Sequence, residues 1–168
     1  MNMQTRDTTT FAPRELRDVL GRFATGVAVV TTCGEASLPV GMTINSFASV
    51  SLDPPEVLWS IARSAPSRKD FFTYGAFAVN VMSDADKEST IQFARPSDDK
   101  FSGIAWRPGL RGIPVLDAAI ATLECETKQI IPCGDHDIIV GSVRAIDGRD
   151  GQPLVFFRGE FLSLGQTI

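Results

Sequence analysis

The spacing of apolar residues near the start of the chain predicts an amphipathic helix. Across Pro13–Thr25 these residues recur at positions i, i+3, i+4, i+7 and i+8, which places them on one helical face. Pro13 suits the first turn of a helix, and Gly26 suits its end. The apolar positions are Leu16, Val19, Leu20, Phe23 and Ala24.

Most other apolar residues fall in short runs with β-branched side chains, a composition typical of strands. We expect about six or seven strands separated by short turns, and two or three helices. A helix is expected after the loop 63–69 and another over 84–94, whereas 95–111, with its Pro and Gly residues, is expected to be a loop. The strand-like runs are 27–33, 38–44, 56–62, 76–82, 118–131 and 135–147, and two short runs, 154–157 and 160–164, close the chain.

This order of elements is not a regular alternation of strand and helix, so a doubly wound parallel sheet is not expected. The pattern predicts a β-rich α+β fold, compatible with one barrel. Neither an internal repeat nor a domain boundary is visible. We therefore expect a single domain over residues 11–168, preceded by a polar, disordered tail over residues 1–10.

Composition narrows the class of protein. The 168 residues carry a net charge of −4, which argues against a nucleic-acid-binding surface. No apolar run approaches the ~20 residues of a membrane span, and the polar N-terminus has no apolar segment of a secretory signal. Three cysteines, an odd number, suggest reduced thiols. We expect a cytoplasmic protein.

The segment Gly41–Pro55, with the sequence GMTINSFASVSLDPP, is dense in short hydrogen-bonding side chains and carries one charge. Such a surface suits a neutral, flat, polar ligand; it lacks the clustered ligands of a metal site. Gly41, inside a predicted strand, indicates close approach by a ligand or another backbone. The alternative is the solvent face of a half-buried strand.

Residues Arg63–Lys69 form a candidate phosphate site. Two hydroxyls, three cations and the start of a predicted helix lie within this run of seven residues, and a helix N-terminus favours anions. The alternative is an ordinary solvated loop. Lys100, which precedes Phe101, is a second candidate cation, or else a surface lysine beside a core aromatic residue.

His136 is the only histidine and lies in the string GDHDIIVGSV. Asp135 and Asp137 flank it and would favour the charged imidazole, which suits a pyrophosphate. The alternative is a structural or exposed histidine. Cys125, Cys133 and His136 lack the paired spacing of zinc ligands, and we expect Cys125 to be a small buried residue.

Four segments, in this order and spacing, resemble the short-chain flavin reductase family: RFATGVAVVTT, GMTINSFASVSLDPP, FAVNVM and GDHDIIVGSV. The resemblance covers about residues 14–164. It implies a split β-barrel with a few peripheral helices, a homodimer, and flavin bound at the subunit interface. The sequence also lacks the G-x-G-x-x-G fingerprint, so any NAD(P)H would bind outside a Rossmann fold, as in this family.

The family resemblance implies an NAD(P)H:flavin oxidoreductase, with NADH favoured, that reduces FMN or FAD and supplies it to a separate monooxygenase. Hydride passes between the two cofactors, so no catalytic side chain is named. His136 would contact NADH. Two alternatives are a flavin-binding or redox-sensing module without catalysis and a pyridoxamine-phosphate-oxidase-like enzyme, which expects more basic residues. The flavin-binding residues implied are Met42, Thr43, Asn45, Ser46, Ser60, Ile61, Ala62, Arg63, Ser67, Arg68 and Lys100.

Overall fold

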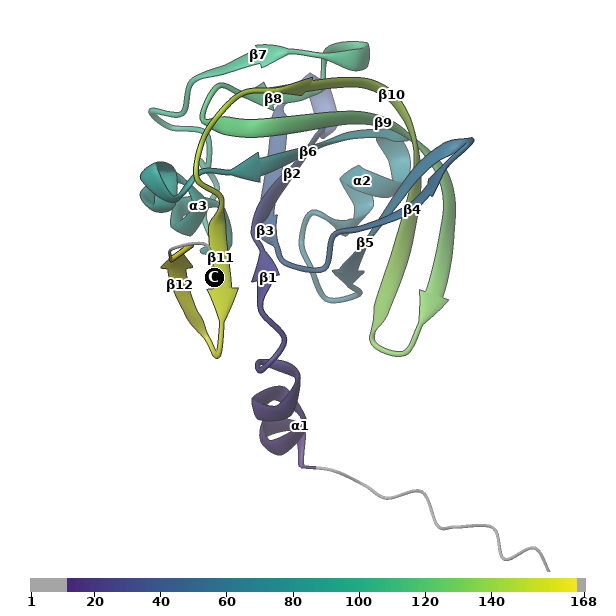
Figure 1. Cartoon of the computed structure of the whole chain (residues 1–168). Coiled ribbons are helices and arrows are strands. Elements are labelled where there is room, and N and C mark those ends of the chain that lie inside the picture. Colours follow the sequence, from purple (N-terminus) through teal and green to yellow (C-terminus); the bar gives the residue numbers. More distant parts are fainter. Residues whose placement is uncertain (1–11, 166–168) are drawn as a thin grey trace, which may run out of the picture.

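The computed structural model describes residues 12–165, so the predicted tail lies outside the described residues. Its main element is a seven-stranded antiparallel sheet with the order β3-β2-β6-β9-β10-β5-β4 (Figure 1). The seven strands are β2 (Ala28–Cys33), β3 (Pro39–Ile44), β4 (Ala48–Leu52), β5 (Pro55–Ala62), β6 (Ala76–Met82), β9 (Ala119–Cys133) and β10 (His136–Gly148).

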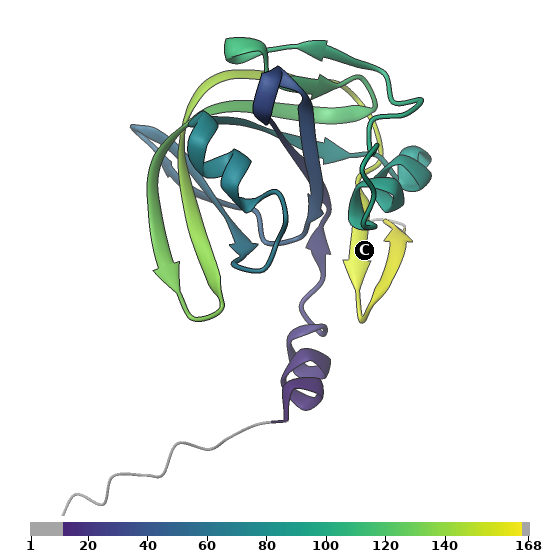
Figure 2. The same cartoon turned by 180° about the vertical axis from the view of Figure 1, so that it is seen from behind.

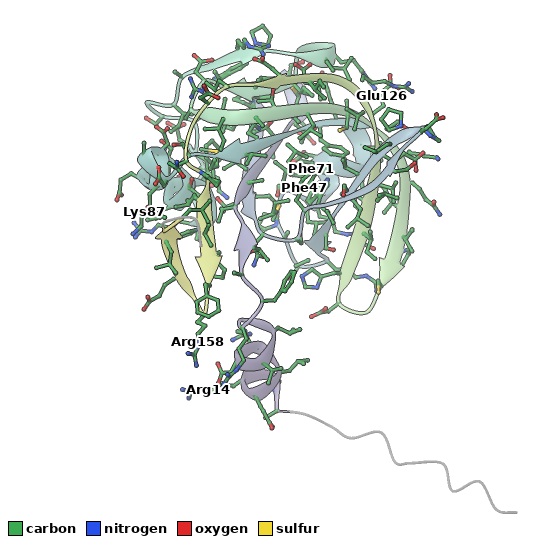
Figure 3. The ribbon with its side chains drawn as sticks, viewed as in Figure 1. Arg14, Phe47, Phe71, Lys87, Glu126 and Arg158 are labelled. Carbon is green, nitrogen blue, oxygen red and sulfur yellow. The ribbon has the colours of Figure 1, made fainter. Side chains whose placement is uncertain are left out.

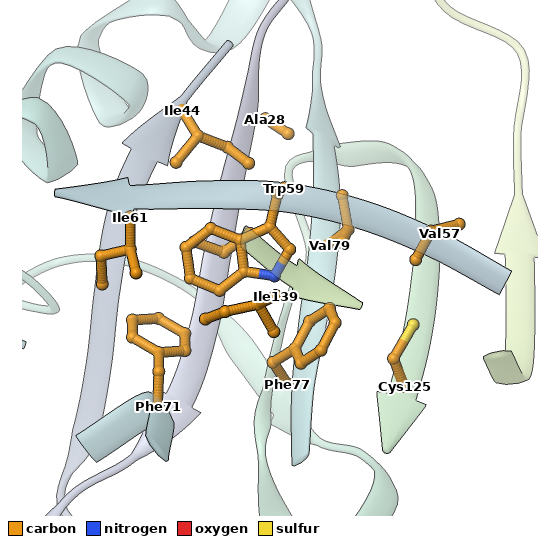
Figure 4. Packing of buried hydrophobic residues seen from close by; sticks show 11 residues of the cluster. Ala28, Ile44, Val57, Trp59, Ile61, Phe71, Phe77, Val79, Cys125 and Ile139 are labelled. Atoms are coloured by element: carbon orange, nitrogen blue, oxygen red, sulfur yellow. The ribbon is translucent and has the colours of Figure 1, made fainter. Parts of the chain in front are cut away.

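The sheet curls around one aromatic core, and β5 and the first half of β10 alternate between buried and less buried residues. On β5, Val57, Trp59 and Ile61 are buried, and the residues between them are not. Trp59 packs edge-on against Phe71, with ring centroids 4.9 Å apart, and against Phe77 at 5.7 Å (Figure 4). Phe71 comes from helix α2 (Arg68–Tyr74), which packs its buried face into this core.

A second apolar cluster covers the outer side of β2. Val27 and Val29 pack there with Met82, Phe93 and Leu154. Phe93 belongs to helix α3 (Lys87–Ala94), and Leu154 to a small sheet with the order β1-β11-β12 (Figure 2). The strands of this sheet are β1 (Thr25–Gly26), β11 (Leu154–Phe157) and β12 (Glu160–Ser163).

The segment 95–111, expected to be a loop, contains a short strand. β7 (Trp106–Pro108) pairs with β8 (Pro114–Leu116), and the three residues of β7 are all exposed, so no alternation marks it in the sequence. β8 is buried and belongs partly to a third cluster around Cys33 and Ile113. Three short 3₁₀ segments complete the secondary structure: η1 (Glu35–Ser37), η2 (Asp84–Asp86) and η3 (Leu110–Gly112).

The first helix is shorter than predicted. Helix α1 (Pro13–Leu20) ends where the Gly21 N–H donates to the Arg17 carbonyl oxygen at 2.8 Å, and Thr25 instead pairs with Phe156 in the small sheet. The helix projects from the barrel, and its side chains, Arg14 among them, stand apart from it (Figures 1 and 3). None of its residues is buried, and the predicted apolar stripe is 45–79% exposed at its large residues.

The predicted fold class is confirmed: a β-rich α+β protein built on a split barrel with a few peripheral helices. Among residues 12–165, none of the helices is long and apolar enough to cross a membrane.

The close approach expected at Gly41 is made by a side chain of the protein itself. A Cβ atom at this position would lie 2.7 Å from Cε1 of Phe93, nearer than atoms can pack. Gly41 therefore lets α3 lie flat against β3, where the Thr43 hydroxyl donates to the Thr90 carbonyl oxygen at 2.6 Å.

We predict that Gly41→Ala lowers the free energy of unfolding by about 1–3 kcal/mol, the usual cost of overpacking a core. Denaturant unfolding measures this change. Gly26→Ala is the matched control, because a Cβ at Gly26 meets no atom within 4 Å. Equal free energies of unfolding for the two variants would show that α3 can move away from the new methyl group without loss of stability.

Candidate functional site

A cleft of about 490 Å³ opens between β3, the loop before α2 and the segment after α3. Four of the predicted flavin-binding residues line it together: Met42, Thr43, Ser67 and Lys100. Its remaining walls come from these segments and from helices α2 and α3. They are Pro39, Val40, Gly41, Ala65, Pro66, Asp70, Phe93, Ala94, Pro96, Ser97 and Asp98.

Lys100 is held in the cleft wall by the end of α3. Its ammonium donates to the Phe93 carbonyl oxygen at 2.9 Å, and its own carbonyl oxygen accepts from Gln92 Nε2 at 2.9 Å. Partial burial lowers the pKa of Lys100, because a desolvated ammonium is less stable. Such an ammonium gains more from an arriving anion than a fully hydrated one.

Ser67 lies directly before α2 and lines the cleft. Its carbonyl oxygen accepts from the N–H groups of Asp70 and Phe71 at 3.1 and 3.3 Å, whereas its hydroxyl does not cap the helix. The hydroxyl lies 3.7 Å from the Met42 sulfur. Asp70 and Asp98 also line the cleft, so its charge is mixed rather than uniformly positive.

Two hydroxyls of the polar stretch are engaged inside the protein. Thr43 bonds to α3, and the Ser46 oxygen accepts from the Ser60 N–H at 3.0 Å and lies 3.3 Å from the Ser60 carbonyl oxygen. Ser46 thereby ties the end of β3 to β5. Asn45 is exposed and lines a smaller cavity of about 220 Å³ with Phe156, beyond the Thr43 wall of the main cleft.

The pairing of β5 with β10 brings the predicted NADH contact next to predicted flavin contacts. His136 lies opposite Ala62, Asp137 opposite Ile61 and Ile138 opposite Ser60. Opposed residues share one face, so His136 and Ala62 face outward, while Asp137 and Ile61 face the core. Ile61 is fully buried, so only its backbone could reach a ligand.

Asp137 does not flank the imidazole as expected, because alternation along β10 turns it inward. Its carboxylate is 1% exposed and accepts from Arg68 Nε at 2.7 Å, with Arg63 Nε at 3.5 Å. The Arg68 hydrogen bond, opposed by desolvation and aided by the nearby charges of both arginines, lowers the pKa of Asp137. Only Asp135 contacts His136, at 2.7 Å from Nδ1, and this hydrogen bond lowers the pKa of Asp135.

The structure therefore separates two residues that are adjacent in the predicted phosphate loop. Ser67 lines the cleft with Lys100, whereas Arg68 and Arg63 meet at Asp137 and do not line it. Asp137 was not singled out as an anchor for these arginines. Strand alternation was the signal that could have shown it, since Asp137, Ile139 and Gly141 all face the core.

The three cysteines differ in burial. Cys125 is buried, as predicted, and burial raises the pKa of its thiol to about 12. Cys33 is also buried, and Cys133 is exposed. Within the described part of the chain, no group of three or more His, Cys, Asp or Glu residues is placed to hold a metal ion.

Known proteins share this architecture. The chain is 41% identical over 89% of its length to the reductase component of a flavin-dependent trigonelline monooxygenase from Acinetobacter baylyi. It is 43% identical over 88% of its length to the FMN reductase (NADH) SmoA of Agrobacterium fabrum, 84% of which is covered. The solved structure of the NADH:FAD oxidoreductase SgcE6 from Streptomyces globisporus C-1027, in complex with NAD and FAD fragments, matches with a TM-score of 0.86. That match has 34% identity and covers 94% of this chain and 98% of the other.

The lengths of these relatives differ. The chain spans about half the length of some curated relatives that it matches, 48% of the Acinetobacter protein and 49% of a Rhizobium meliloti one. The family model described as "Flavin reductase like domain" matches residues 20–165, nearly all of the described chain. On this match the chain belongs to the flavin reductase like domain family.

Proposed function

We propose that the protein is a flavin reductase that oxidises NADH, reduces FMN or FAD, and releases the reduced flavin to a separate monooxygenase. The observation that carries this proposal is the cleft in which Met42, Thr43, Ser67 and Lys100 meet, next to the strand pair that bears His136. Relatives described as an NADH-dependent FMN reductase, an NADH:FAD oxidoreductase and a monooxygenase reductase component support it.

The residues of the cleft suit a flavin mononucleotide moiety. Lys100 and Ser67 would bind the phosphate, one by charge and one by a hydroxyl donor. The carboxylates of Asp70 and Asp98 are acceptors for the hydroxyls of a ribityl chain. Met42 and the backbone of residues 60–62 would lie along the ring, with Asn45 as the exposed amide nearby.

The chain would act on the reaction by positioning its two ligands. A bound flavin supplies a hydride acceptor, which must stack on the nicotinamide at roughly 3–3.5 Å. His136, on the outward face beside Ala62, would hold the nicotinamide nucleotide at the flavin. No side chain has to move a proton in this step, and none in the cleft is paired with a nucleophile.

We also propose a homodimer. The apolar residues of α1 are exposed on a helix that stands away from its own barrel, and a second copy would cover them. The flavin site would then lie near the contact between subunits, as the family resemblance implies.

Purified protein should oxidise NADH only when FMN, FAD or riboflavin is added. The loss of NADH absorbance measures this oxidation. Free flavin should turn over many times per protein molecule. Flavin binding without NADH oxidation would instead support the non-catalytic binding or redox-sensing module.

Lys100→Ala should weaken FMN binding by about tenfold and leave riboflavin binding unchanged, because only FMN carries the phosphate. Fluorescence titration with both flavins measures the difference. Lys87→Ala, an exposed lysine on α3 outside the cleft, is the matched control and should bind both flavins as the wild type does.

The preference of the wild type for FMN over riboflavin should also depend on pH. The ratio of FMN affinity to riboflavin affinity should be highest below the pKa of Lys100 and should fall as pH rises through that pKa. Because this pKa is lowered, the fall should come at a lower pH than for an ordinary lysine. Equal losses for the two flavins would remove Lys100 from the phosphate site.

Light scattering at micromolar concentration should give twice the mass of the chain. Replacing Val19 and Leu20 with serine should shift the protein toward the monomer, because it removes apolar surface that the partner would bury. Asp18→Ala, on the same exposed helix, should leave the dimer intact. A monomeric wild type would contradict the proposal.

A further inference from the structure

A second cationic site lies outside the cleft, at the start of β10. Arg63 and Arg68 converge on the buried carboxylate of Asp137, one residue after His136. A backbone hydrogen bond joins the same two segments, since the Arg63 N–H donates to the Asp135 carbonyl oxygen at 3.0 Å. Asp135 in turn bonds the imidazole of His136.

The two arginines are held in place, but they keep hydrogen-bond donors for a further ligand. Arg68 Nε donates a hydrogen bond to Asp137, and the guanidinium carbon of Arg68 lies 4.2 Å from the centre of the Phe72 ring. Contacts on two sides fix the planar group, while its two terminal amino groups remain for another acceptor. The side chains of Arg68 and Arg63 are 36% and 47% exposed, so these groups reach solvent.

The charges of this group are unequal. Two guanidinium groups share one buried carboxylate, which can offset only one of them. Asp135, the other carboxylate nearby, is exposed and hydrogen-bonded to His136. A site of this kind, half-open and with preoriented arginine donors, suits a phosphate or pyrophosphate.

The location of the arginine pair indicates which phosphate it would bind. The proposed flavin phosphate site uses Lys100 and Ser67, which line the cleft, whereas neither Arg63 nor Arg68 lines it. The arginine pair lies instead at the residues next to His136, because Ala62 is the register partner of His136 and Arg63 follows it.

We propose that Arg63 and Arg68, positioned by Asp137, bind the pyrophosphate of the nicotinamide dinucleotide rather than the flavin phosphate. This inference rests on the proposed function and assigns a subsite within it. Arg63 and Arg68 would contact the phosphate oxygens with their terminal amino groups. Asp137 is a positioning residue, because its carboxylate forms ion pairs with both arginines.

The test measures binding and turnover separately. ADP-ribose carries the pyrophosphate but no nicotinamide, and its dissociation constant is measured by calorimetry. N-benzyl-1,4-dihydronicotinamide donates hydride without any phosphate and serves as the second reductant. FMN and riboflavin titrations report on the flavin site.

The variants are chosen to keep the protein folded. Arg63→Ala removes the more exposed arginine. Arg68→Ala alone would strand a buried carboxylate, so it is combined with Asp137→Asn. Lys69→Ala is the control, because it removes a cation from the same helix that is paired with Glu35 instead.

Both arginine variants should bind ADP-ribose about tenfold more weakly and show a similarly raised KM for NADH. Turnover with the benzyl reductant and the affinity for FMN should match the wild type, as should every property of Lys69→Ala. Weaker FMN binding with riboflavin spared would overturn the inference, because it assigns the arginines to the flavin phosphate.

Failure of this inference differs from failure of the proposed function. NADH oxidation together with wild-type ADP-ribose affinity in both variants overturns the arginine subsite alone. A wild-type protein that oxidises no NADH with any flavin overturns the function and the subsite together.

Discussion

The antiparallel pairing of β5 with β10 is the constraint on which both the core and the candidate site depend. The register that places Trp59 opposite Ile139 also places Ala62 opposite His136. A shift of one residue would turn Trp59 out of the core and His136 into it. Burial of this aromatic side chain therefore fixes which residues of the strand pair face a ligand.

The same alternation forces a charge toward the interior at Asp137. A buried carboxylate without a partner would cost several kcal/mol or would take up a proton. Arg68, 69 positions away in sequence, and Arg63, in the loop before it, prevent this, and Arg68 lies over the ring of Phe72. The cost of burying Asp137 is thus offset by contacts that also fix the loop between β5 and α2.

The sequence predicts much of this fold where a pattern is local. The runs that became β5, β6 and β10 carry enough apolar and β-branched residues to be recognised, and Pro–Gly punctuation marks most turns. Residue types alone marked the polar stretch with Thr43, the loop with Ser67, and Lys100 as candidates, but left a bland alternative for each, and the family resemblance assigned them to one ligand. By contrast, β7 has three exposed residues and is held by its partner β8, so nothing in its own sequence marks it.

Tertiary partners decide what the sequence could not show. The stripe on α1 is a correct amphipathic pattern, yet burial depends on a surface that this barrel does not provide. Thr43 and Ser46 look like ligand-binding hydroxyls, but Thr90 and Ser60 take up their hydrogen bonds. These hydrogen-bond partners and packing surfaces come from residues distant in sequence, so the local sequence does not show them.

The divergence of Ser67 and Arg68 has a physical reason in the reaction that we propose. Flavin and nicotinamide rings must stack closely, yet both ligands carry phosphates whose like charges repel. A site that holds both needs two separate anion-binding positions with the rings between them. The turn at residues 62–68, closed by hydrogen bonds from Ala65 to Ala62 and from Arg68 to Ala65, would let one loop serve both in the proposed site. Ser67 lines the cleft, whereas the guanidinium of Arg68 bonds Asp137 on the strand pair that bears His136.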